Sequence, residues 1–90
     1  MGQIKSILIL GRSDPNEAMR VAAGLTIFGH QPSVIFLLPV PKTPENAEML
    51  ELLEFSDVES KTTVADDAYP HVGPDALASA ILMADEVINI

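Results

Sequence analysis

The sequence predicts an α/β protein, in which helices cover both faces of a small parallel sheet of about four strands as a three-layer α/β/α sandwich. Three observations support this fold class. Short aliphatic runs alternate along the chain with segments of helical periodicity, each helical segment has a proline at its first position, and the connections are short. With no internal repeats or linkers, we expect residues 1–90 to form one domain.

The first strand and helix are expected at the start of the chain. Residues 4–10 are mostly aliphatic or β-branched, a pattern typical of a strand that is buried on both faces. Asp14 precedes a proline and supplies an N-cap, so we expect a helix over residues 15–28 that ends at a left-handed Gly29. Its apolar stripe consists of Ala18, Val21, Ala22, Leu25 and Phe28.

The second strand and helix repeat this pattern. Residues 33–38 are apolar, and the two prolines that follow cannot donate to a sheet ladder. Thr43 and Pro44 mark the start of a second helix, whose glutamates form either a solvated face or a surface that guides a basic partner. The apolar face of this helix consists of Ala47, Leu50 and Leu53, with Met49 and Leu52 beside them.

The last third of the chain completes the sheet. Residues 60–65 contain more threonine and alternate, as expected for a strand near an edge. A third helix begins at Pro74, and residues 86–90 alternate like a fourth strand. The stripe of the third helix consists of Leu77, Ala80, Ile81 and Ala84.

Composition limits the function classes. Thirteen acidic residues against five basic ones give a formal charge of −8, which disfavours unaided binding to nucleic acid or to an anionic membrane and favours a basic protein partner. The absence of cysteine excludes disulfides, thiolate metal sites and a cysteine nucleophile. With no secretory signal pattern and no apolar run near the roughly 18 residues of a bilayer span, we expect a cytoplasmic protein.

The turn Gly11, Arg12, Ser13 and Asp14 is a candidate ligand-binding segment. It follows a strand and opens a helix, the place where α/β proteins usually bind ligands. We interpret Ser13 and Asp14 first as capping residues, because Asp14 would repel an anion and no glycine-rich nucleotide motif is present. An anion or nucleotide site is the alternative.

A second candidate segment follows the third strand and holds Asp66, Asp67, Tyr69 and His71. A general base or a metal could be assembled there, but the spacing matches no metal site, and no Ser-His-Asp set or catalytic carboxylate pair is present. We therefore expect solvated or capping acids, and we retain Asp67, Tyr69 and His71 as ligand-binding candidates. We expect no metal, no cofactor and no catalytic residue.

Several of these segments are similar to one known family. They are the strand of residues 4–10, the Gly-x-Ser-Asp-Pro turn, the alanine-rich helix that ends in Phe-Gly-His, and the strand of residues 33–38. The closing helix, the Ala84-Asp85 dipeptide and the final strand agree with them. Over somewhat more than half of its length, the chain resembles the DsrE/DsrF/DsrH family, which includes the TusBCD sulfur-relay subunits.

The resemblance implies an α/β/α sandwich that assembles into homotrimers, hexamers or mixed hexamers. In active family members a loop cysteine carries persulfide sulfur for tRNA thiolation or sulfur oxidation. This chain has no cysteine, so no catalytic residue can be carried over from the family. The segment of residues 52–65 is also shorter than the corresponding part of larger relatives. Some subunits of the mixed assemblies also lack the cysteine and serve as scaffolds.

The leading hypothesis is therefore a non-catalytic DsrE-like subunit that forms oligomers. The partner would be a second copy, in a dimer, trimer or hexamer, or a related subunit, because a four-stranded sheet leaves two open edges in a monomer. A small-ligand-binding protein or enzyme is the alternative, with a strand-end pocket formed by residues 11–14 and residues 66–71. A sulfur carrier would need another nucleophile and ranks third.

Overall fold

The computed structural model describes residues 4–65 and 68–90, which form three helices and one sheet of four strands. The elements alternate strictly along the chain, as the sequence predicts. They are β1 (Ser6–Gly11), α1 (Pro15–Ile27), β2 (Gln31–Phe36), α2 (Pro44–Phe55), β3 (Glu59–Thr62), α3 (Pro74–Met83) and β4 (Glu86–Asn89).

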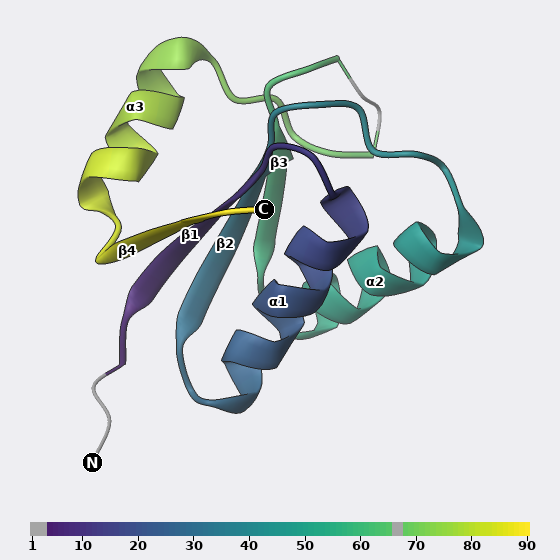
Figure 1. The fold of residues 1–90 in the computed structure, drawn as a ribbon, viewed down its shortest axis with the longest axis horizontal. Coiled ribbons are helices and arrows are strands. Elements are labelled where there is room, and N and C mark those ends of the chain that lie inside the picture. The colour runs from purple at the N-terminus through teal and green to yellow at the C-terminus, as the bar shows by residue number, and fades with distance from the viewer. Residues whose placement is uncertain (1–3, 66–67) are drawn as a thin grey trace.

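The sheet is parallel throughout, and its spatial order is β3-β2-β1-β4. In its register Gly11 pairs with Phe36 and Ile7 with Glu86. β2 and β3 are added in turn on one side of β1, and β4 is then added on the other side of β1. Because parallel crossovers are right-handed, this reversal places α3 on the opposite face from α1 and α2. The predicted three layers therefore follow from the strand order (Figure 1).

The core has two parts, one on each face of the sheet. Under α1 and α2, Ile9 and Phe36 pack with Met19 of α1 and Leu53 of α2. The part under α3 is smaller. It consists of Leu8, Leu10 and Ile35, with Leu37, Leu77, Ala80, Ala84 and Val87 packed against them.

The helix starts agree with their predicted caps. Asp14 Oδ1 accepts from the backbone N–H of Glu17 at 3.1 Å, and Thr43 Oγ1 accepts from that of Asn46 at 3.1 Å. Gly29 has a φ of 84°, the left-handed conformation expected at the end of α1.

Four predicted core positions are wrong. Phe28 lies beyond the last turn of α1 and is 79% exposed. Ala47 and Leu52 of α2 and Ile81 of α3 are also exposed. In α2 the polar Asn46 is buried instead. Periodicity did not show this exchange, because Asn46 faces inward to join hydrogen bonds with other segments.

Several strand ends also differ from prediction. β1 starts at Ser6 instead of residue 4, and β2 ends at Phe36 instead of residue 38. Two other ends have a local cause. β2 starts at Gln31, whose N–H donates to the carbonyl of Lys5 at 2.9 Å. β3 ends at Thr62 instead of residue 65, since the Thr62 hydroxyl accepts from the N–H of Val64 at 3.2 Å. This local bond turns the chain away from the sheet.

Candidate functional site

The predicted turn follows β1, which is an interior strand of the sheet. Its backbone N–H groups, however, already make hydrogen bonds. The N–H groups of Arg12 and Ser13 donate to the carbonyl of Ile90 at 2.7 and 3.0 Å. Asp14 caps α1, and the side chains of Arg12, Ser13 and Asp14 are exposed. The amides that would meet an anion therefore already have an acceptor.

Phe36 fills the space beside this turn. A Cβ atom on Gly11 would lie 2.8 Å from Cδ1 of Phe36, so only glycine fits there without movement of the ring. The Phe36 ring also meets Tyr69 edge to face, with centroids 5.1 Å apart and planes at 66°. The turn after β1 and the loop after β3 are thus joined through a buried aromatic ring.

In the second predicted segment, Tyr69 and His71 lie in different environments. Tyr69 is buried, whereas His71 is exposed and pairs with Thr62 in a short parallel bridge. Thr62 donates to the carbonyl of Pro70 at 2.9 Å and accepts from the N–H of Val72 at 2.8 Å. Asp66 and Asp67 lie outside the described residues.

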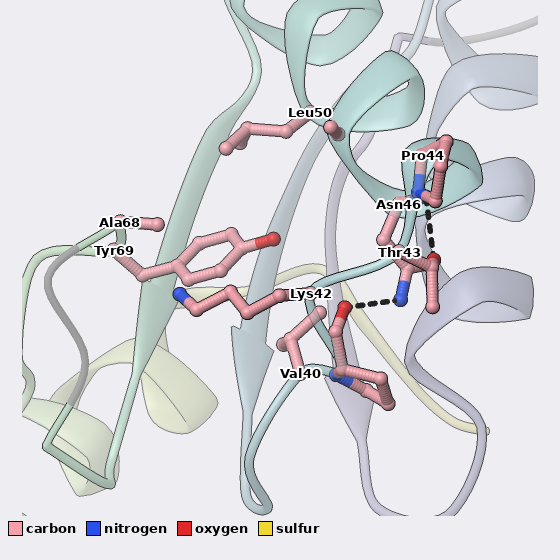
Figure 2. A pocket seen from close by; sticks show the side chains of 10 residues that line it. Val40, Lys42, Thr43, Pro44, Asn46, Leu50, Ala68 and Tyr69 are labelled. Atoms are coloured by element: carbon pink, nitrogen blue, oxygen red, sulfur yellow. Dashed lines mark hydrogen bonds between the residues drawn. The ribbon is translucent and has the colours of Figure 1, made fainter.

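A cavity of about 340 Å³ opens on the other side of Tyr69, between the segment that follows β2 and the first turns of α2 (Figure 2). Of the predicted site residues that the structure describes, Tyr69 alone is among its lining residues. The lining residues are Val40, Pro41, Lys42, Thr43, Pro44, Asn46, Ala47, Leu50, Ala68 and Tyr69.

The polar groups of this cavity are already paired. Asn46 receives a bond from Asn16 Nδ2 at 2.9 Å and donates from its own Nδ2 to the carbonyl of Pro41 at 2.8 Å. Thr43 caps α2. Lys42 extends along the ring of Tyr69, with Nζ 6.0 Å from the ring centroid (Figure 2). What remains for a ligand is mainly apolar surface and one aromatic ring.

Sequence reasoning missed this cavity, although one signal was present. Pro39, Pro41 and Pro44 fall within six residues. Such spacing keeps the chain extended after β2, because each proline fixes φ and restricts the residue before it. The segment therefore runs out from the sheet before α2 begins, and Tyr69 approaches from a distant part of the chain.

A second hollow of about 610 Å³ lies at the opposite, amino-terminal edge of the sheet and is lined mainly by polar residues. His30 is among them, and its Nδ1 accepts from the N–H of Lys5 at 3.2 Å. That bond ties the end of α1 to the approach to β1. His30 thus has a structural role.

Within residues 4–65 and 68–90, no three His, Asp or Glu side chains gather as a group that could hold a metal ion. Over the same residues, no helix is long and apolar enough to cross a membrane.

Comparisons with known proteins add a fold relationship. No protein-family model matches the chain, and no curated protein matches it. The crystal structure of a yeast protein, YNL200c, superposes with a TM-score of 0.56 and 14% sequence identity over 97% of this chain. The chain spans about half of the yeast protein's length, 48% of it. At this identity, the likeness supports the α/β fold and carries no function.

Proposed function

We propose that this chain is a non-catalytic, DsrE-like subunit that assembles through α3 and β4 with a second copy of itself or with a related subunit. The single observation that carries the proposal is the state of α3. None of its ten residues, all of them described, is buried, and Leu82 and Met83 are 85% and 81% exposed. Large apolar side chains held out on one element are typical of interaction surfaces.

The neighbouring edge of the sheet supports the same surface. Ile90 donates to the carbonyl of Leu10 at 3.0 Å and accepts from the N–H of Arg12, so its backbone groups face β1. The backbone N–H and C=O groups of successive residues point to opposite sides of a strand, so the groups of Val87 and Asn89 face away from β1. Among the described residues, no strand pairs with that outer side of β4.

The opposite edge of the sheet is better protected. β3 carries Lys61, a residue type that discourages pairing at an edge, and residues 70–72 lie against its last residue. This asymmetry favours β4 over β3 as the edge that joins another chain.

An antiparallel pairing of two β4 strands about a two-fold axis at Ile88 satisfies the open backbone groups. It sets Val87 opposite the partner's Asn89, so the outward-facing residues bond to each other. The same register sets Glu86 opposite the partner's Ile90, which keeps the two acidic side chains apart. Ile88 then lies opposite the Ile88 of the second copy. The two form a non-hydrogen-bonded pair, in which the side chains are closely spaced.

The lack of cysteine limits what such a subunit does. Without a thiol the chain has no group to accept persulfide sulfur. In a sulfur-relay assembly it would hold or orient a related subunit that supplies the cysteine. A basic partner is the other candidate, because α2 carries four exposed glutamates.

Light scattering after size exclusion, at micromolar concentrations, tests self-assembly. Asn89→Pro removes an outward-facing N–H and leaves the ladder to β1 intact, while Leu82→Lys places a charge on α3. The matched control is Phe55→Lys, at an 89% exposed position at the end of α2. We expect oligomers for the native chain and for the control, and monomers for the two variants.

Two results contradict self-assembly through α3 and β4. A native chain that is monomeric at tens of micromolar, which is roughly the range of weak self-association, excludes assembly with itself. Oligomers that survive both Asn89→Pro and Leu82→Lys but dissociate in Phe55→Lys would move the interface to the ends of α1 and α2, where Phe28 is also exposed.

A further inference from the structure

The cavity beside Tyr69 lies on the β3 side of the sheet, away from the β4 edge, and its role is independent of assembly. A volume of about 340 Å³ is in the range of small-molecule sites. Its walls come from two distant parts of the chain, the residues from Val40 to Leu50 and the residues Ala68 and Tyr69.

The walls are held in place before any ligand arrives. The ring of Tyr69 is packed against Phe36. Asn46 bonds to α1 through Asn16 and to the preceding segment through Pro41, which fixes the first turn of α2. A preformed wall reduces the entropy that binding must otherwise overcome.

The chemistry of the lining selects the class of ligand. Thr43 and Asn46 already use their side chains in capping and bridging bonds, so a polar ligand would lose water and gain little in return. The formal charge of −8 opposes anions. Apolar walls with one aromatic ring favour a flat, uncharged molecule.

We propose that this cavity binds a compact, uncharged molecule of one or two aromatic or alicyclic rings, with the ring of Tyr69 as one wall. Naphthalene is a suitable probe, and naphthalene-2-sulfonate is its anionic counterpart. Tyr69 is the sole tyrosine and the chain has no tryptophan, so the intrinsic fluorescence reports on this wall alone.

The experiment titrates both probes into the native chain, Ala47→Leu and Ala78→Leu, and follows tyrosine fluorescence and amide NMR shifts. Ala47 lines the cavity, whereas Ala78 is an exposed position on α3 that serves as the matched control. The added side chain of Ala47→Leu should weaken naphthalene binding about tenfold, as expected from the loss of roughly two buried methylene contacts. Ala78→Leu should bind as the native chain does.

In the native chain, naphthalene should quench Tyr69 and shift the amides of Ala47, Leu50 and Ala68. This shift pattern keeps the test decisive even if Ala47→Leu does not fold. Three results overturn the proposal: no saturable binding of naphthalene, equal weakening in both variants, or stronger binding of the sulfonate than of naphthalene. The last result would indicate an anion site that involves Lys42.

Discussion

Asn16 and Asn46 join the two helices on one face of the sheet through a side-chain hydrogen bond, from Asn16 Nδ2 to Asn46 Oδ1, at 2.9 Å. Asn46 is only 6% exposed and also donates to the carbonyl of Pro41 at 2.8 Å. One amide therefore connects α1, the segment after β2 and the start of α2. The same amide borders the cavity beside Tyr69.

We expect Asn46→Ala to lower the free energy of unfolding by about 1–3 kcal/mol, because it leaves the amide of Asn16 without its partner and removes one of the two hydrogen bonds that the carbonyl of Pro41 accepts. Urea denaturation followed by circular dichroism measures this loss. Asn16→Ala is the control and should cost less, since Asn16 is only half-buried and makes one of these bonds. Equal losses of unfolding free energy in the two variants would show that the additional bond from Asn46 to Pro41 does not contribute to stability.

Gly11→Ala should destabilise the fold by about 1–3 kcal/mol, because the new methyl group would press on the fully buried ring of Phe36. Gly24→Ala provides the contrast, as none of the described residues lies near the new methyl group. Within α1 it should stabilise by about 0.5–1 kcal/mol. Thermal unfolding of both variants tests the pair. If Gly11→Ala left the unfolding temperature unchanged, the ring of Phe36 would be free to move away from the new methyl group.

Asp57 has a φ of 60°, an unfavourable conformation for a residue with a side chain. We expect Asp57→Gly to raise the unfolding free energy by up to about 1 kcal/mol, as measured by chemical denaturation. Gly29→Ala should lower it by a similar amount, since Gly29 has a φ of 84°. If Asp57→Ala stabilised the chain as much as Asp57→Gly, relief of backbone strain would not be the cause.

Phosphate or a nucleotide added at millimolar concentration should leave the amide signals of Arg12 and Ser13 unchanged in NMR spectra. Both N–H groups already donate to Ile90, and displacement of that carbonyl would cost a strand contact. Saturable shifts confined to these two amides would instead identify the turn as an anion site. The amide of His30, which donates to the carbonyl of Leu25 at the far end of α1, serves as a reference for effects of ionic strength.

The start of each helix was predictable, because the signals lie within a few residues of one another. Asp14 and Thr43 each precede a proline and each accepts an N–H three residues later. The end of β3 was not predictable in the same way. The residues after Thr62 favour a strand by composition, and only the bond from Val64 to the Thr62 hydroxyl shows where pairing stops.

The candidate site was predictable only in part. The sequence predicts Tyr69 as a loop residue after a strand, which is correct, but it predicts a pocket shared with the turn after β1. Phe36 occupies the space between them, and the open volume lies beside α2 instead. Linear spacing does not show which distant side chain fills the end of a sheet.

The sequence by itself determined the alternation of strands and helices, the caps, the acidic charge and the absence of a thiol. These features depend on residue type and on neighbours within one or two turns of chain. The tertiary structure decided the strand order, which put α3 alone on one face, left β4 at an edge and brought Tyr69 to α2. Those outcomes depend on contacts between residues far apart in the chain, whose geometry is set only when the sheet is assembled.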